Sequence, residues 1–250
     1  MDKPRVLILD IETAPILAYV WQLKDQNVGL SQIDKDWHVM AWAAKWLGDP
    51  PSKTIYRDQR NAKNMEDDKE ILQPIWKLLD EADIVITQNG KNFDGPKLNA
   101  RFITHGMNPP SPYKHLDTYQ IVRRVAKFTS NKLEYLTGKL CTKYKKLSHK
   151  KFPGMELWKE CLKNNVTAWN EMKTYNIHDV LATEEFYMKI RAWAPESMAH
   201  PYFVTDVATQ CATCGVKGQM IKQGPRPARK TFKQRYQCRK CGAWATGEKV

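Results

Sequence analysis

Two acidic residues follow an apolar run near the start of the chain. In the segment "VLILDIET" (residues 6–13), Asp10 and Glu12 come directly after the apolar residues 6–9. Residues two apart in a strand face the same side, so the two carboxylates would lie together and repel each other. Hard divalent cations such as Mg²⁺ bind carboxylate oxygens and supply the compensating charge. The pair predicts a divalent metal site if further carboxylates converge on it from other segments.

Two later segments supply such carboxylates. In "NGKNFDGPKLNAR" (residues 89–101), Asp94 follows a predicted strand and begins a predicted helix, at the kind of strand end where α/β folds build sites. Taken alone, Asp94 fits a helix cap at least as well. In "YNIHD", Tyr175 and Asp179 are four residues apart and would share one face of a helix. Together the three segments predict a cluster of four carboxylates and one phenol.

The elements that must position these side chains alternate along the chain. Apolar or β-branched runs predict strands at residues 4–10, 38–48, 53–57 and 82–90. Helical spacing of apolar residues predicts helices at residues 67–81, 93–105, 117–126 and 131–139, and a long amphipathic helix over 166–193 that has room for one break. Strands alternating with helices indicate an α/β domain with helices on the faces of a central sheet.

The motifs "LDIET", "NGKNFDGPKLNAR" and "YNIHD" resemble, in the same order, the three exonuclease motifs of the DEDD exonucleases in the ribonuclease H-like superfamily. They are similar to those of family B DNA polymerase proofreading domains, and the resemblance spans about residues 4–193. It implies a ribonuclease H-like mixed sheet flanked by helices, with 3′→5′ exonuclease activity on nucleic acid. It also implies DNA rather than RNA as the substrate, and replication or repair proteins as further partners.

The resemblance assigns roles residue by residue. It implies that the metal ligands are Asp10, Glu12, Asp94 and Asp179. Tyr175 lies four residues before the last Asp, as in the DEDDy branch, whereas Thr174 occupies the position of the His of the DEDDh branch. Thr13 resembles the residue whose backbone approaches the terminal nucleotide, and Asn92 could position substrate or cap a turn.

The expected chemistry can also be argued from the residue types. Two divalent ions can activate a water, neutralise the phosphoryl oxygens and stabilise the leaving oxygen of a phosphodiester. Four carboxylates suit a pair of Mg²⁺ or Mn²⁺ ions, because these ions prefer oxygen ligands. Tyr175, with an ordinary phenol pKa of about 10, would orient the attacking water rather than act as a strong base.

Three alternatives accompany this interpretation. Asp117 could add a fifth carboxylate, but its place before a helical run favours a cap. The same residues could serve a structure-selective endonuclease, because metal ligands do not decide whether a free end is required. A non-catalytic nucleic-acid-binding adaptor is disfavoured by the intact carboxylates.

Four histidines have no paired spacing and are expected to be structural or at the surface: His105, His115, His149 and His200.

Four cysteines near the end of the chain form a second motif. Cys211 and Cys214 lie in "CATCG", and Cys238 and Cys241 lie in "CRKCG". Two C-x-x-C pairs of this spacing suit one tetrahedral structural Zn²⁺, and the following glycines let the backbone amides turn toward the thiolates. Two disulfides are the rival interpretation, which the lack of a secretory signal disfavours. The pattern predicts a small C-terminal zinc ribbon.

The positive charge is concentrated in two segments. The chain has a formal net charge of +13, and residues 123–151 and 211–250 each hold ten Lys or Arg against one acid. Local basic surfaces suit a polyanionic partner. In the ribbon we expect nucleic-acid contacts from Arg226, Arg229, Lys230, Lys233 and Arg235. Phe232 and Tyr236 could stack on unpaired bases or form the ribbon's own core together with Trp244.

The chain of 250 residues is long enough for one domain of ordinary size and one small domain. We expect a nuclease domain at residues 1–194, a linker at 195–208 and a zinc ribbon at 209–250. No apolar stretch is long enough to cross a bilayer, and residues 1–10 are an acid-interrupted strand rather than a signal peptide. The sequence therefore predicts a soluble, cytoplasmic protein without a membrane partner.

Overall fold

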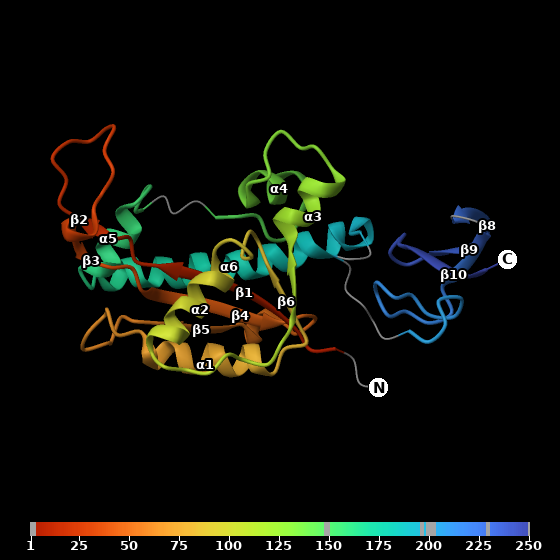
Figure 1. Ribbon diagram of the computed structural model, residues 1–250, viewed down its shortest axis with the longest axis horizontal. Helices are drawn as coiled ribbons and strands as arrows, with labels where there is room; N and C mark the ends of the chain where they lie inside the picture. Colours follow the sequence, from red (N-terminus) through yellow and green to blue (C-terminus); the bar gives the residue numbers. More distant parts are fainter. Residues whose placement is uncertain (1–3, 148–150, 196–197, 199–203, 229–230, 250) are drawn as a thin grey trace.

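A five-stranded mixed sheet forms the centre of the larger part of the molecule (Figure 1). The computed structural model describes residues 4–147, 151–195, 198, 204–228 and 231–249. The strands lie in the order β5-β4-β1-β6-β7. β1 pairs parallel to β6 and antiparallel to β4, so it lies at the middle of the sheet. The strands are β1 (Val6–Thr13), β4 (Val39–Trp46), β5 (Ile55–Asp58), β6 (Ile84–Thr87) and β7 (Lys114–Asp117).

Strand β1 is apolar on both faces because helices cover both faces of the sheet. Leu7 and Leu9 pack in a core with residues of α1 (Lys69–Asp80) and α2 (Asp94–Thr104). Val6 and Ile8 pack on the opposite face against α6 (Val166–Ile190). A strand that is covered on both faces has a nearly continuous run of apolar residues in its sequence. By the alternation of the strand, Asp10 and Glu12 extend the face that α6 covers.

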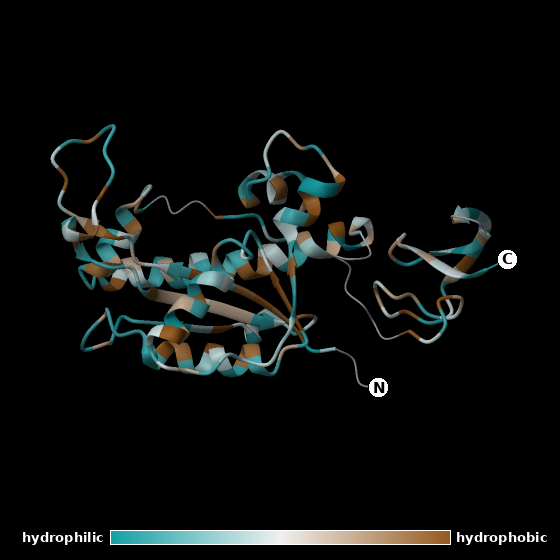
Figure 2. Ribbon diagram, in the orientation of Figure 1, coloured by the Kyte–Doolittle hydropathy of each residue, from teal (hydrophilic) through white to brown (hydrophobic). Residues whose placement is uncertain are grey.

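Three further helices pack around α6. α5 (Glu156–Leu162) shares a core with α6 and β4, while α3 (Thr118–Val125) and α4 (Leu133–Leu140) share another core with the second half of α6. Figure 2 shows hydrophobic residues concentrated in the central sheet and in stripes along the helices. The remaining elements of this part are short: β2 (Leu17–Ala18), β3 (Ile33–Lys35), and the 3-10 helices η1 (Leu30–Gln32), η2 (Pro51–Lys53) and η3 (Arg191–Trp193).

The predicted fold class is confirmed, and the differences lie in individual elements. Helix α6 runs unbroken for 25 residues, and the range 166–193 changes from α-helix to 3-10 helix at Arg191, where η3 begins. The Asn165 side chain caps its start by accepting from the Thr167 amide at 2.9 Å. Sequence patterns missed β7, α5 and the β2–β3 pair, because each is too short to display a clear period.

A second, three-stranded antiparallel sheet lies in the C-terminal part of the chain. Its strands are β8 (Met220–Ala228), β9 (Thr231–Cys238) and β10 (Trp244–Lys249), in the order β10-β9-β8. The domain boundaries expected from sequence stay predictions. Within the described residues, no helix combines the length and apolar character that crossing a membrane requires.

Truncation of Leu7 tests the central position of β1. Leu7 is fully buried, so Leu7→Ala should lower the free energy of unfolding by about 2–5 kcal/mol in guanidinium denaturation. Leu23 is 96% exposed, and the matched change Leu23→Ala should alter it by less than about 0.5 kcal/mol. Equal effects of the two substitutions would contradict the described core.

Candidate active site

Strand β1, helix α2 and helix α6 bring the four predicted carboxylates together at one end of the sheet. Asp94 and Asp179 are buried, with 3% and 2% of their surface exposed, and Asp10 and Glu12 are half-buried. The charges of Asp94, Asp179 and Glu12 all act on the Asp10 carboxyl group. The residues opposite Asp10 and Glu12 on β4 are alanines, whose small side chains leave room for the carboxylates.

Neighbouring backbone and amide groups hold two of the carboxylates. Asp94 is the first residue of α2, and Phe93 before it is the N-cap, so Asp94 does not occupy the cap position. Its Oδ1 instead accepts from the backbone N–H of Ile11 on β1 at 3.0 Å, so the cap alternative does not describe its contact. The Asn176 amide on α6 donates to Asp10 Oδ2 at 2.6 Å. These bonds fix the two carboxylates to the sheet and to the helix.

Two side chains that the sequence analysis did not assign to the site hold the other two carboxylates. Trp158 on α5 donates its indole N–H to Glu12 Oε2 at 3.1 Å. Lys146 forms an ion pair with Asp179, with Nζ and Oδ2 2.7 Å apart. The sequence alone places Lys146 only within the basic segment 123–151. No spacing pattern links Lys146 or Trp158 to the motifs, because the contacts are made by separate segments of the chain.

Loss of hydration raises the pKa of each of the four carboxyl groups. For Glu12, burial and then the Asp179 charge raise the pKa to about 8, and for Asp94 burial raises it to about 7. The pKa of Asp10 is raised by burial and by its three acidic neighbours, and that of Asp179 by burial against the opposing charge of Lys146. Such crowding is relieved when cations lie among the carboxylates.

The donor set fits divalent cations. The available ligands are carboxylate oxygens, which suit Mg²⁺ or Mn²⁺ better than Zn²⁺. Asp179 Oδ1 is buried and has no hydrogen-bond partner among the described residues. An orphaned buried carboxylate oxygen is costly unless a proton or a metal satisfies it. Asp10, Glu12, Asp94 and Asp179 could therefore hold divalent metal ions.

Tyr175 lies one helical turn before Asp179 and is 8% exposed. Its ring packs edge-on to Trp158, with centroids 6.3 Å apart, and Lys146 Nζ lies 4.8 Å from its centroid. Burial and the Asp179 charge raise the pKa of the Tyr175 phenol, so the hydroxyl keeps its proton at neutral pH. The group can donate or accept a hydrogen bond but is a poor general base.

Asp117 acts as the expected helix cap and also holds the turn before Asp94. Its carboxylate accepts from the Tyr119 amide at 3.0 Å, and from the amides of Asn89 and Lys91 at 2.8 and 3.1 Å. In this turn a Cβ on Gly90 would lie 2.3 Å from Thr87 Oγ1, so only glycine fits there. The turn thereby sets the start of α2.

The histidines have structural contacts, as expected for those that the structure describes. His105 Nε2 lies 2.7 Å from Asp68 Oδ1, and His115 Nε2 lies 2.8 Å from Thr87 Oγ1. His178 donates from Nε2 to the Lys145 carbonyl at 2.6 Å, which helps to place the segment that carries Lys146. His149 and His200 lie outside the described residues.

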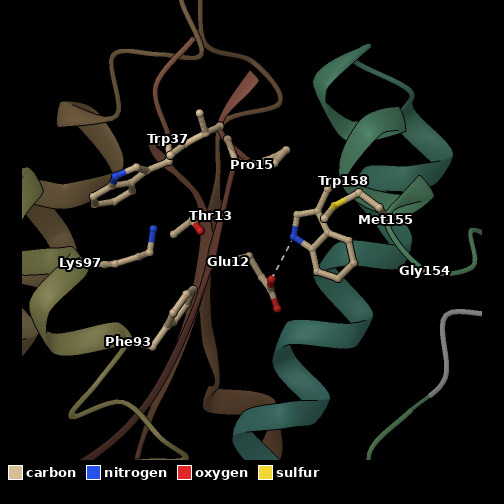
Figure 3. A pocket seen from close by; sticks show the side chains of 11 residues that line it. Glu12, Thr13, Pro15, Trp37, Phe93, Lys97, Gly154, Met155 and Trp158 are labelled. Carbon is tan, nitrogen blue, oxygen red and sulfur yellow. Dashed lines mark hydrogen bonds between the residues drawn. The ribbon is translucent and has the colours of Figure 1, made fainter. Parts of the chain in front are cut away.

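A pocket of about 480 Å³ opens beside Glu12 (Figure 3). Thr13 lines it, as do several aromatic side chains. Asn92 does not line this pocket; its amide donates to Asn89 Oδ1 at 3.4 Å within the preceding turn. Of the two residues expected near substrate, Thr13 is thus beside the pocket and Asn92 is not.

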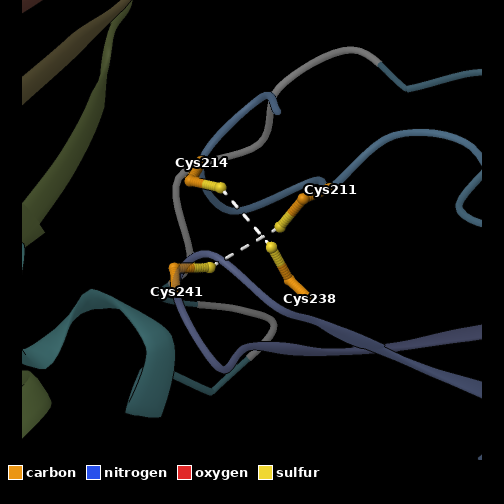
Figure 4. Close-up of side chains that lie close together, drawn as sticks. All are labelled: Cys211, Cys214, Cys238 and Cys241. Carbon is orange, nitrogen blue, oxygen red and sulfur yellow. Dashed lines mark hydrogen bonds between the residues drawn. The ribbon is translucent and has the colours of Figure 1, made fainter. Parts of the chain in front are cut away.

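The four C-terminal cysteines converge (Figure 4). Their sulfur atoms all lie within 4.8 Å of one another. Cys211 and Cys241 Sγ are 3.7 Å apart, and Cys214 and Cys238 Sγ are 3.8 Å apart. Tetrahedral Zn–S bonds of about 2.3 Å would separate sulfurs by about 3.8 Å, whereas a disulfide needs about 2.05 Å. The cluster fits a zinc ribbon.

The glycines after each cysteine pair adopt the expected turn. Gly215 has φ of 69° and Gly242 has φ of 77°, a left-handed conformation that favours glycine. Their amides donate to the carbonyls of Cys211 and Cys238 at 2.8 and 2.9 Å. The amides of residues 213 and 214 also face the Cys211 sulfur. Both halves of the cluster therefore have the backbone form that stabilises thiolates.

Three of the five expected contact residues of the ribbon, Arg226, Lys233 and Arg235, lie on its β-sheet. Arg226 on β8 is paired in register with Lys233 on β9, and Arg235 stacks on Trp244 with its guanidinium carbon 5.1 Å from the ring centroid. Like charges directly opposite each other destabilise a sheet unless an anion lies between them. Two other expected contact residues, Arg229 and Lys230, lie outside the described residues.

The aromatic residues of the ribbon divide between core and surface. Phe232 and Trp244 are each 53% exposed. Tyr236 is half-buried, and its ring lies beside Gly247, where an added Cβ would come within 2.9 Å of it. Tyr236 is therefore the member of this group that packs in the ribbon, while Phe232 and Trp244 are accessible.

The raised carboxyl pKa values predict how stability depends on pH in the absence of added divalent metal. A carboxyl group whose pKa rises on folding favours the folded state while protonated, and that contribution is lost as the pH rises through the folded pKa. Glu12 has an ordinary pKa of 4.5 and a folded pKa of about 8, so Glu12→Gln should become steadily more stable relative to the parent protein as the pH rises from about 4.5 to about 8. Thermal unfolding at a series of pH values measures this difference. A difference that is constant with pH would contradict the crowding of the carboxylates.

Comparisons with known proteins agree with the fold. No curated protein sequence matches the chain. Among solved structures, the family B DNA polymerase from the hyperthermophilic archaeon Pyrobaculum calidifontis is similar, with a TM-score of 0.55 and 16% identity over 76% of this chain. The match spans 25% of that polymerase's length. A family model of the RNase_H superfamily matches residues 7–191. This range includes β1, α2 and α6, which carry the four carboxylates. The chain therefore belongs to the RNase H superfamily.

Proposed function

We propose that the chain is a metal-dependent 3′→5′ exonuclease of the DEDDy type that hydrolyses phosphodiester bonds, with DNA as the substrate. The observation that supports this most strongly is the cluster of Asp10, Glu12, Asp94 and Asp179 in an RNase H fold, with Tyr175 one helical turn from Asp179. The likeness to a DNA polymerase supports DNA over RNA and suggests replication or repair proteins as further partners.

The proposed chemistry assigns a task to each part of the cluster. When bound, two Mg²⁺ or Mn²⁺ ions would activate the attacking water and neutralise charge on the phosphoryl and leaving oxygens. Asp10, Glu12, Asp94 and Asp179 would hold them. Tyr175 would orient the water through its protonated hydroxyl, since its raised pKa makes it a poor base. Thr13, at the edge of the pocket, would contact the terminal nucleotide.

Lys146 completes the charge balance of the proposed site. Its side chain is 27% exposed, and its ammonium group lies 2.7 Å from Asp179 Oδ2 and 4.8 Å from the centroid of the Tyr175 ring. A lysine in this place offsets one negative charge and is near enough to Tyr175 to restrict its ring. We propose that Lys146 positions Asp179 and Tyr175 rather than reacting itself.

We propose that the C-terminal ribbon binds one structural Zn²⁺ and helps to hold nucleic acid. The cysteine geometry supports the zinc, and the paired charges of Arg226 and Lys233 and the exposed aromatic rings support the contact with phosphates and bases. In this proposal residues 1–194 form the nuclease domain, 195–208 the linker and 209–250 the ribbon.

Product ladders test the function directly. The purified protein is incubated with Mg²⁺ and with single-stranded, duplex, circular and RNA substrates labelled at either end. The proposal expects stepwise shortening from the 3′ end of DNA and no cut in circles. Cleavage of circles would indicate a structure-selective endonuclease instead, and binding without cleavage would indicate an adaptor.

Single substitutions in the site should distinguish the metal ligands from Tyr175, which orients the water, by the size of the loss of cleavage. Asp10→Ala or Asp179→Ala should abolish cleavage while folding and nucleic-acid binding persist, because each removes a metal ligand and little core volume. Tyr175→Phe should be milder, since it removes only a hydroxyl. The exposed Asp34→Ala is the matched control and should keep full activity. Full activity in either ligand variant would refute the assignment.

Removal of the ribbon's metal should weaken binding but leave the nuclease fold intact. Cys238→Ser combined with Cys241→Ser should release zinc, measured by metal analysis, and unfold residues near 209–250. Affinity for nucleic acid should then fall and depend less steeply on salt, because fewer phosphate contacts release fewer counterions. Cleavage of a short saturating substrate should suffer less than that of a long dilute one. An unchanged salt slope in the zinc-free variant would assign the phosphate contacts to residues 123–151.

A further inference from the structure

Seven basic side chains are exposed on α3, on α4 and on the loops next to these helices. We call this set the cationic face, and its members are Arg123, Arg124, Lys127, Lys132, Lys139, Lys143 and Lys145. Glu134 is the single acid in the sequence between residues 118 and 147. Among the ion pairs of the described residues, none includes a member of this face. The face is therefore available to an anionic partner.

One hydrophobic core holds the elements of the cationic face together. The buried sides of α3 and α4 pack with Cys141 and with the second half of α6. Figure 1 shows α3 and α4 next to each other beside α6. The exposed residues of the two helices therefore belong to adjoining surfaces.

Glu185 on α6 fixes the segment that follows α4. Its carboxylate accepts hydrogen bonds from three successive backbone amides, those of residues 142–144, at 2.8, 3.1 and 2.6 Å. This segment carries Lys143 and Lys145 of the cationic face. Its backbone is therefore ordered before any ligand binds.

Aromatic rings hold three cations of the face. Arg123, Lys139 and Lys143 lie 5.5, 5.9 and 5.2 Å from the centroids of the rings that they cover, which are Tyr119, Tyr135 and Tyr144. A side chain that is already restricted by such a contact loses less freedom when it binds a phosphate. These three cations are therefore partly preorganised for an anionic ligand.

Phe128 offers a flat apolar surface among these cations. It is 36% exposed, and it lies in the loop between α3 and α4 directly after Lys127. An unpaired base can stack on such a ring, whereas the bases of a duplex are already stacked on each other. Cations that track a backbone, combined with an exposed ring, therefore favour a single strand over a duplex.

The cationic face borders the carboxylate cluster. A pocket of about 360 Å³ is lined by Tyr119 on α3, by Lys132 of the face and by Lys146. Lys146 in turn pairs with Asp179, with Nζ and Oδ2 2.7 Å apart. The face and the proposed active site therefore meet at this pocket.

We propose that the cationic face binds the phosphate backbone of a single-stranded nucleic acid whose end lies at the carboxylates. The inference rests on the proposed function, because the face would hold the strand that the site shortens, separately from the ribbon. Arg123, Lys139 and Lys143 contact phosphates, and Phe128 stacks on a base.

The salt dependence of binding tests the phosphate contacts without turnover. The affinity of the full chain for a fluorescent single-stranded DNA is measured by anisotropy over a series of NaCl concentrations, without added divalent metal. Each lost phosphate contact should make the slope of log affinity against log salt shallower by about 0.7. The combined variant Arg123→Gln, Lys139→Gln and Lys143→Gln should therefore bind more weakly, with a slope shallower by about 2.

A matched control removes the same charge elsewhere on the protein. Lys53, Lys63 and Lys77 are exposed and lie outside the cationic face. The combined variant Lys53→Gln, Lys63→Gln and Lys77→Gln has the same net charge as the first variant, and it should keep nearly the slope of the parent protein. Equal slopes in the two triple variants would overturn the proposal.

Phe128 tests whether the strand is unpaired. Phe128→Ala should weaken binding of single-stranded DNA about 5- to 100-fold, as the loss of a base stack does, and should leave the affinity for a blunt duplex unchanged. Val125→Ala, at a residue 37% exposed at the end of α3, is the control and should change neither affinity. Equal losses for both substrates in Phe128→Ala would contradict a single strand on this face.

The outcomes separate this inference from the proposed function. If the protein shortens DNA from its 3′ end while both triple variants keep the parent slope, the exonuclease stands and the cationic face is refuted. If only the triple variant of the face has a shallower slope and the protein cleaves no substrate, the face is supported and the exonuclease is refuted.

Discussion

The repulsion among crowded carboxylates is the constraint on which the rest of this structure depends. Asp10, Glu12, Asp94 and Asp179 lie close enough for their charges to act on one another, and each has a raised pKa because burial removes its hydration. Such a group is stable only with protons, positive side chains or metal ions to offset the charge. An arrangement this costly indicates a site selected for function rather than for stability.

The fold holds the carboxylates on its central strand and on helices that pack against the sheet. β1 is the central strand and is packed on both faces, so Asp10 and Glu12 have little freedom to move apart. Asn176 on α6 and Trp158 on α5 each hold one of them by a hydrogen bond. The stability of the sheet and of α6 is therefore what keeps the charged groups together without bound metal.

Sequence patterns predicted the parts of this arrangement that follow local periodicity. The apolar run of β1 and the four-residue spacing of Tyr175 and Asp179 each follow a period of the backbone, and the C-x-x-C pairs predicted the cysteine cluster directly. The contacts of Lys146 and Trp158 could not be predicted, since each joins segments far apart in the chain through one side chain. The shape of the pocket was missed for the same reason. Its walls come from four separate segments of the chain, which only the tertiary structure brings together.

The central claim is that the four carboxylates form a binding site for divalent metal. The most direct measurement is anomalous X-ray diffraction from crystals of the protein grown with Mn²⁺. We expect two anomalous peaks about 3.5–4 Å apart, bounded by Asp10, Glu12, Asp94 and Asp179. Strong peaks at other places, with these carboxylates bound only to protons, Lys146 or water, would contradict the account.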